Sequence, residues 1–220
     1  MINFYWKQQK SMLIMSIIAL ILMSTSFILP KEYGYENHIF ENIELVILVL
    51  GIIVSIYKLV HYAIIESIKF YIALILIYIL MLGREINWGR VFYPVKILPD
   101  GDTIYISLDK LWYGQIVYPS IAVLAVISLI ILGYFIYESK LKNIQWNIPI
   151  EASIMFVVMS LLSQCVFELE YVKIISNYNQ LLEEICEMIS YAALVYCSYQ
   201  IDFCKFYTKI KYFDMIKSRL

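Results

Sequence analysis

The sequence contains few charged residues. Asp, Glu, Lys and Arg make up 16% of its 220 residues, whereas an ordinary soluble domain has roughly 25%. Hydrophobic residues account for 62%, so a soluble fold of this composition would lack the polar surface that water requires. The composition therefore excludes an ordinary soluble domain and predicts that lipid covers part of the chain.

Histidine and paired cysteine are also scarce. The two histidines, His38 and His61, are too few for a zinc-dependent membrane hydrolase. The four cysteines form no C-x-x-C pair, which argues against a quinone-linked thiol enzyme, and three lie in apolar stretches like ordinary packing residues. A membrane protease of the E-E-x-x-x-R type would need arginine where this chain has Met188. The sequence accordingly predicts no catalytic residue, no metal ligand and no cofactor.

Long apolar runs dominate what is present. A membrane-spanning helix needs about 20 residues, and continuous runs of this length differ from the alternating strands of a membrane barrel. We therefore predict an all-α, polytopic membrane helix bundle of about six transmembrane helices within one domain, residues 1–202. The predicted helices cover residues 11–29, 42–62, 68–83, 115–137, 149–167 and 181–201. The first run is alternatively a cleaved signal peptide, because Lys7 and Lys10 precede it.

The distribution of positive charge predicts the orientation. With the N-terminus in the cytoplasm, eleven of the 17 Lys and Arg residues fall on the inner side, which agrees with the positive-inside rule. An even number of spans returns the C-terminus to the cytoplasm. The inner residues are Lys7, Lys10, Lys58, Lys69, Lys140, Lys142, Lys205, Lys209, Lys211, Lys217 and Arg219.

Two segments outside the predicted spans have features of their own. The longest loop, 84–114, contains Val95-Lys-Ile-Leu, Pro99-Asp-Gly-Asp and Thr103-Ile-Tyr-Ile, which together predict a small outer-side β-hairpin. The tail, 203–220, is basic and aromatic. It is either a helix that lies on the anionic inner leaflet or a segment that only sets the topology.

Charged side chains near the ends of the predicted spans are the candidate site. An ionisable group in the hydrocarbon costs at least about 2.5 kcal/mol, so such a group suggests a function. Arginine and glutamate on the outer side either form a buried structural network or line an outward-facing pocket for a polar ligand. The candidate residues are Glu44, Arg84, Glu85, Trp88, Arg90, Glu183, Glu184 and Glu187.

The stretch Gly83-Arg-Glu-Ile-Asn-Trp-Gly-Arg-Val-Phe-Tyr-Pro94 is the most distinctive in the chain. It resembles a group of uncharacterised bacterial multi-pass membrane proteins that carry E-I-[SN]-W-G-[RQ] at the end of a spanning helix. In those proteins an outer loop then ends in a pattern like Tyr113-Gly-Gln-Ile-Val-Tyr-Pro119. The resemblance implies a shared fold and the bacterial cytoplasmic membrane, and it brings no established activity.

Three functional hypotheses remain open at this point. The first is a non-enzymatic binding, transport or interaction subunit that uses the outer Arg/Glu cluster. The second is a membrane-embedded enzyme that acts on a lipid or cell-envelope precursor, with Glu85 or Glu187 as acid or base. The third is a stabilising partner of a larger membrane complex. Membrane lipids and a membrane-protein partner are the expected contacts, whereas the net charge of −1 predicts no nucleic acid.

Overall fold

The chain is mostly helical in the computed structural model, which describes residues 2–5, 9–35, 38–62, 64–98, 103–169 and 178–205. Six α-helices occupy these residues: α1 (Gln9–Thr25), α2 (Ile39–His61), α3 (Ile68–Glu85), α4 (Gly114–Leu141), α5 (Ile150–Leu162) and α6 (Asn179–Gln200). The strands are short: β1 (Ile2–Tyr5), β2 (Pro94–Ile97), β3 (Thr103–Tyr105), β4 (Ile144–Pro149) and β5 (Asp202–Lys205).

Each of the six predicted helical segments overlaps one of these helices. The first is shorter than predicted, because α1 ends at Thr25 and a turn follows at Ser26. Four helical segments of the described chain are long and apolar enough to cross a membrane: Lys31–His61, Ile65–Glu85, Gly114–Leu141 and Ile150–Phe167. The sequence was therefore right about a helical fold of membrane character.

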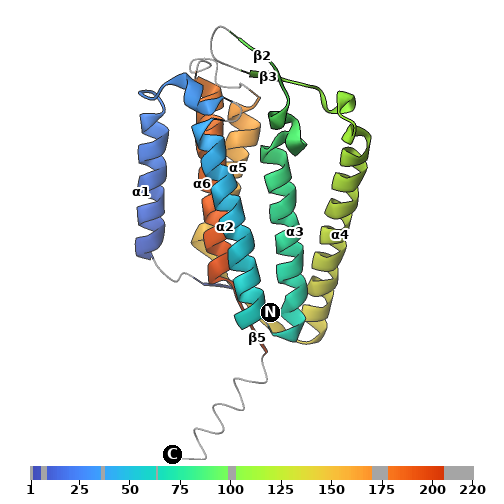
Figure 1. The fold of residues 1–220 in the computed structure, drawn as a ribbon. Helices are drawn as coiled ribbons and strands as arrows, with labels where there is room; N and C mark the ends of the chain where they lie inside the picture. The colour runs from blue at the N-terminus through green and yellow to red at the C-terminus, as the bar shows by residue number, and fades with distance from the viewer. Residues whose placement is uncertain are drawn as a thin grey trace, which may run out of the picture.

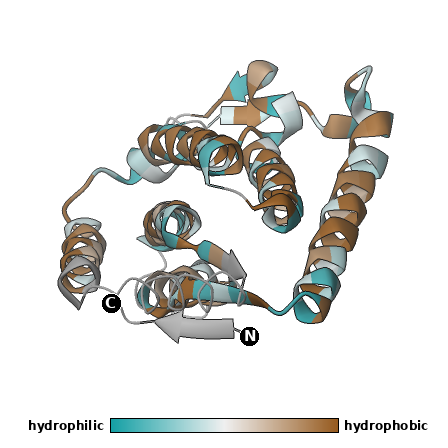
Figure 2. Ribbon diagram, turned by 90° about the horizontal axis from the view of Figure 1, so that it is seen from below, coloured by the Kyte–Doolittle hydropathy of each residue, from teal (hydrophilic) through white to brown (hydrophobic). Residues whose placement is uncertain are grey.

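The helices pack side by side along one direction (Figure 1). The order of packing is α5, α6, α2, α3 and α4, each helix lying against the next. Helix α1 lies beside α6, on the opposite side of the molecule from α4, as the end-on view shows (Figure 2). Helix α6 is therefore the central element, in contact with α1, α2 and α5.

Two hydrophobic clusters hold this arrangement together. One cluster joins α1, α2, α5 and α6 around Leu181, Ile185 and Cys186. The other joins α2, α3, α4 and the strands β4 and β5 around Tyr71, Tyr78 and Phe135. Close approach of α2 and α3 depends on Gly51, since an added Cβ there would lie 2.5 Å from Tyr78 Cε1. Small residues at such a crossing are typical of helices that pack within membranes.

A three-stranded sheet closes one end of the bundle. Strand β4, between α4 and α5, pairs in parallel with β1 and antiparallel with β5. The sequence did not predict this sheet: residues 203–205, assigned to the tail, belong to β5, and the rest of that tail lies outside the described residues. Both terminal strands are thus held at the same end of the bundle.

The predicted hairpin is confirmed at the other end. Strands β2 and β3 pair antiparallel, with Lys96 opposite Ile104, and they lie at the upper end in Figure 1. The turn predicted at 99–102 lies outside the described residues. The hairpin marks the end of the molecule that also carries the candidate site.

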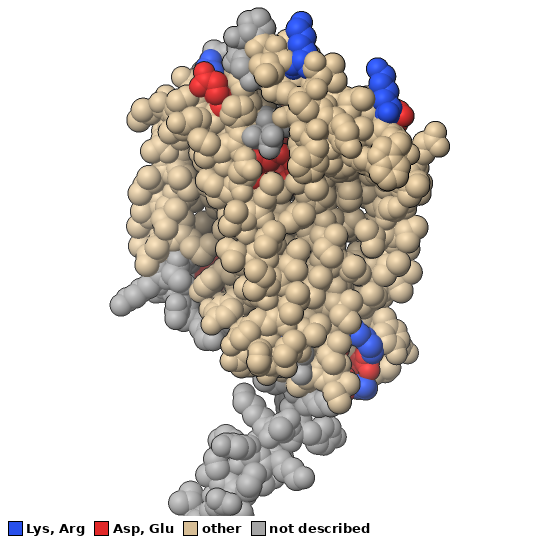
Figure 3. Space-filling view, viewed as in Figure 1, with Lys and Arg blue, Asp and Glu red and all other residues tan. Residues whose placement is uncertain are grey.

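The outer surface of the bundle is apolar between its two ends. In Figure 3 the charged side chains gather at the top and bottom of the visible face, and a wide uncharged band separates them. Exposed leucine, isoleucine and valine side chains populate this band on α1, α2 and α4. At the sheet end, Lys142 binds Glu138 at 2.6 Å and Glu66 at 3.4 Å. Such a surface suits a hydrocarbon layer with water on either side.

Candidate functional site

The candidate site lies where four helices meet at the hairpin end of the bundle. Helices α2 and α6 begin there, and α3 ends there (Figure 1). Helix α5 also ends there, in a π-helical turn (η5, Ser163–Phe167). The site therefore collects residues that are far apart in the sequence, and its charged groups come from α2, α3, α6 and Glu168, which follows η5.

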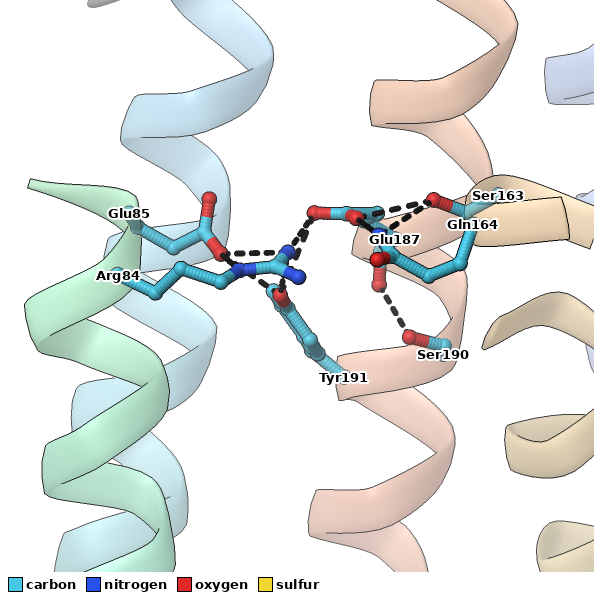
Figure 4. A network of polar contacts seen from close by, with 7 residues as sticks. All are labelled: Arg84, Glu85, Ser163, Gln164, Glu187, Ser190 and Tyr191. Carbon is cyan, nitrogen blue, oxygen red and sulfur yellow. Dashed lines mark hydrogen bonds and ion pairs between the residues drawn. The ribbon is translucent and has the colours of Figure 1, made fainter. Parts of the chain in front are cut away.

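An arginine from α3 and a glutamate from α6 form the centre of the site. Arg84 donates from Nη2 to Glu187 Oε2, and the same nitrogen lies 2.9 Å from Glu85 Oε1 (Figure 4). A second bond runs from Arg84 Nε to Glu85 Oε1 at 3.0 Å. The two carboxylates are buried, whereas 47% of the Arg84 side chain remains exposed. One guanidinium therefore bridges two buried carboxylates.

Three uncharged side chains complete the network. The hydroxyl of Tyr191 donates to Glu85 Oε1 at 2.7 Å and lies 3.3 Å from Glu187 Oε2. Ser163 Oγ donates to Glu187 Oε1 at 2.9 Å, and Gln164 Nε2 donates to the same oxygen. Glu187 thus accepts bonds on both oxygens from α3, α6 and the turn after α5, which ties these elements together.

The π-helical turn explains why two consecutive residues reach one carboxylate. In a regular helix, neighbouring side chains point about 100° apart and do not share a partner. The wider turn at Ser163–Phe167 brings both Ser163 and Gln164 to Glu187. Single π-turns occur often at functional positions of helices, so the distortion agrees with a site at this place.

A cavity of about 440 Å³ opens above the network. Six glutamates and one arginine are among the described residues that line it, together with three amide side chains. The lining residues are Glu41, Arg84, Glu85, Asn87, Gln164, Glu168, Gln180, Glu183, Glu184 and Glu187. Carboxylates outnumber cations six to one, so the cavity attracts positive charge and repels anions.

A smaller cavity of about 190 Å³ lies on the other side of the network. Met81, Phe156 and Tyr191 are among the residues that line it, and they make it less polar than the first. Three residues line both cavities: Arg84, Gln164 and Glu187. The Arg84–Glu187 pair therefore separates the acidic cavity from a second space deeper in the bundle.

Glu44 of α2 lies beside this network without taking part in it. Its side chain is completely buried, and neither of its oxygens has a hydrogen-bond partner among the described residues. One oxygen each of Glu44, Glu85 and Glu187 lie within 4.8 Å of one another, a spacing that suits a metal ion. Like charges at that separation repel by roughly 3 kcal/mol at an effective dielectric constant of about 20. Arg84, which is bonded to Glu85 and Glu187, supplies one positive charge against this repulsion.

The structure brings together six of the eight residues that the sequence singled out. Arg84, Glu85, Glu183, Glu184 and Glu187 line the acidic cavity, and Glu44 lies next to two of them, Glu85 and Glu187. The other two lie elsewhere.

Trp88 and Arg90 support the chain around the site. The ring of Trp88 packs on Gly83, where an added Cβ would lie 2.5 Å from Trp88 Cζ3. Arg90 donates from Nε to the carbonyl oxygen of Ile106 at 2.9 Å and so fixes the loop near β3. Among the described residues, Arg90 forms no ion pair with the glutamates of the site. Positive φ angles at Asn87, Trp88 and Gly89 turn the chain away from them just before Arg90.

Sequence reasoning missed the uncharged partners of the network. Tyr191 follows Glu187 by four residues on α6, so the shared face of the helix is a signal that could have found it. Ser163 and Gln164 had no such signal, because their position depends on the π-helical turn. Glu41 precedes Glu44 by three residues on the same face of α2 and also lines the cavity.

The arrangement suits the binding of a cation better than it suits acid–base chemistry. Hydrogen bonds hold Glu187 by both oxygens and Glu85 by one, so the two carboxylates are fixed negative charges beside the cavity. No known family model, curated protein or solved structure matches this chain, so its function is argued from the site alone.

Proposed function

We propose that the chain crosses the membrane six times, with α1 and α6 as spans in addition to the four apolar segments. Helix α6 has 22 residues, about 33 Å at 1.5 Å per residue, which matches a hydrocarbon core about 30 Å thick. Its glutamates lower its hydropathy, but they face the site at the centre of the bundle, where lipid does not reach them. Helix α1 exposes Leu13, Ile17 and Leu20, as a lipid-facing helix would.

The common position of the terminal strands supports an even number of crossings. Strands β1 and β5 belong to the same sheet at one end of the bundle, so the chain enters and leaves on one side. In the topology expected from the sequence, most lysine and arginine residues lie on the side of the two chain ends. Under the positive-inside rule, that side is the cytoplasmic side. The acidic cavity then opens to the outer side of a bacterial cytoplasmic membrane.

Within this topology, we infer that the protein is a non-enzymatic subunit that binds a positively charged solute, for storage, sensing or transport. The observation that carries this inference is the acidic cavity, in which six glutamates face one arginine. A cavity of about 440 Å³ is within the range of small-molecule sites, about 300–1,000 Å³. Water in the cavity hydrates the approaching cation, and the buried carboxylates at the floor supply fixed negative charge.

The stretch that carries the family resemblance contributes directly to this site. Glu85 accepts bonds in the network, Trp88 covers Gly83, and Arg90 fixes the loop through Ile106. We propose that proteins with this stretch share the fold and the cavity.

The binding proposal is tested with small cations and, for comparison, with small anions. Purified protein in detergent is melted with Ca²⁺, Mg²⁺, spermidine, choline or, as controls, acetate and phosphate. At least one cation should raise the melting temperature in a saturable way, because a ligand that binds only the folded state stabilises it. The Glu183→Gln/Glu184→Gln variant, which removes two charges from the cavity wall, should bind that cation more weakly. A panel in which cations shift the midpoint no more than the anions do would refute the proposal.

A further inference from the structure

We propose that Glu44, Glu85 and Glu187 form a binding site for one hard divalent cation beside the acidic cavity. The inference rests on the proposed function and names the class of cation that this part of the cavity takes. It depends on four observations: the spacing of the three carboxylates, the burial of Glu44, the balance of charge and the donor atoms.

The spacing fits a shared ligand. The three carboxylate oxygens all lie within 4.8 Å of one another, so a common point exists within about 2.8 Å of each, close to the 2.3–2.6 Å of calcium–oxygen contacts. The three residues come from α2, α3 and α6, which are packed against one another. A cation at the common point would therefore join three helices without a change in the fold.

The burial of Glu44 is an independent sign of a missing partner. A cluster of acidic residues is common on protein surfaces and indicates nothing alone, but Glu44 is 0% exposed and both its oxygens are without a hydrogen-bond partner among the described residues. Native proteins satisfy nearly all buried polar groups, and a buried unpaired carboxylate is among the most costly of them. A cation bound by Glu44 supplies the partner that the described residues do not provide.

The charges balance when one divalent cation is present. Arg84 is the only cation bonded to the cluster among the described residues, and it neutralises one of the three carboxylates. The remaining two negative charges equal the charge of one divalent ion. The bonds that Arg84 and Tyr191 make to Glu85 all meet one oxygen of that carboxylate, and its other oxygen points away from them (Figure 4).

The donor atoms select the kind of metal. Carboxylate and water oxygens suit Ca²⁺, Mg²⁺ and Mn²⁺, whereas Zn²⁺ and copper favour imidazole or thiolate ligands. Glu85 and Glu187 also line the acidic cavity, so water can reach the ion and complete its coordination shell. The site therefore takes a hydrated hard cation from the outer side.

The test compares Glu44→Gln with the wild type and with the control Glu32→Gln. The glutamine keeps the size of the side chain and removes its charge, and Glu32 is exposed and belongs neither to the cavity lining nor to the three proposed ligands. Each protein is freed of metal with EDTA and titrated with Ca²⁺, Mg²⁺ or Mn²⁺ alone by calorimetry. We expect the wild type to bind one equivalent of at least one ion, Glu44→Gln to bind it at least about tenfold more weakly, and the control to keep most of the affinity.

A second measurement separates a ligand from a residue that matters only for folding. In EDTA, Glu44→Gln should melt at or above the wild-type temperature, because it no longer buries an unpaired charge. With saturating metal, the wild type and Glu32→Gln should gain stability and Glu44→Gln should not.

Two results would overturn the metal site: no divalent ion bound by the wild type, or equal binding by Glu44→Gln. If spermidine or choline still binds, the proposal of a cation-binding acidic cavity is supported and only the metal site fails. If no cation of either kind binds, both proposals fail.

Discussion

Glu187 is the residue on which the polar network depends most, and its replacement by alanine gives a quantitative test. The substitution removes the acceptor for Arg84, Tyr191, Ser163 and Gln164. Loss of one partner of a fully buried ion pair costs about 3–5 kcal/mol. Because 47% of the Arg84 side chain is exposed and can turn toward water in the cavity, we expect a smaller loss of roughly 2 kcal/mol in the free energy of unfolding.

The assay is equilibrium unfolding in detergent with EDTA present, so that bound metal does not contribute. A loss of this size corresponds to a fall of about 4–8 °C in the melting temperature of a chain of this length. Glu183→Ala is the matched control: it removes a carboxylate from the same helix and the same cavity wall, and its cost should stay within about 0.5 kcal/mol. Equal midpoints for Glu187→Ala, the control and the wild type would refute the reasoning about the network.

Three further substitutions test the packing and the ion pairs at the sheet end, each by thermal unfolding in detergent. Gly51→Val should destabilise the protein by about 1–3 kcal/mol, because the new side chain meets the ring of Tyr78; an unchanged midpoint would contradict the close helix crossing. Phe203→Ala should cost about 3–5 kcal/mol, because β5 places this ring in the aromatic cluster of α3 and α4, and a loss below 1 kcal/mol would argue against the sheet. Lys142→Met should have little effect, and its effect should vanish in high salt, because its bond to Glu138 is exposed to water; a large effect that persists in salt would be unexpected.

The helical fold could be predicted from the sequence because its signal is local. Each apolar run is long enough to identify a helix without knowledge of its neighbours, and Pro-Asp-Gly-Asp between two β-branched segments identifies the hairpin. The sheet of β1, β4 and β5 could not be predicted in this way. Its strands are four to six residues long, and their partners are far away in the sequence, as in the pairs Ile2 with Trp146 and Trp146 with Phe203. No local pattern specifies such a partner.

The candidate site was predictable in its charges and not in its geometry. Arg84, Glu85 and Glu187 were found because ionisable groups near membrane depth are costly. Arg90 looked equivalent in sequence, but the positive φ angles that precede it turn it toward Ile106. The isolation of Glu44 depends on which donors surround it in space, so only the structure shows that its oxygens lack partners.

The central claim is that an acidic cavity opens to the outer side of the membrane and receives cations. Its most direct test is thiol labelling in intact cells of a variant with Gln180→Cys as its sole cysteine, since Gln180 lines the cavity and is exposed. Impermeant methanethiosulfonate reagents that differ only in charge are compared, and Lys140→Cys at the sheet end is the control. We predict that the cationic reagent modifies position 180 from outside faster than the anionic one, while position 140 reacts only after permeabilisation. Labelling of position 140 but not 180 from outside, or equal rates for the two reagents at position 180, would contradict the claim.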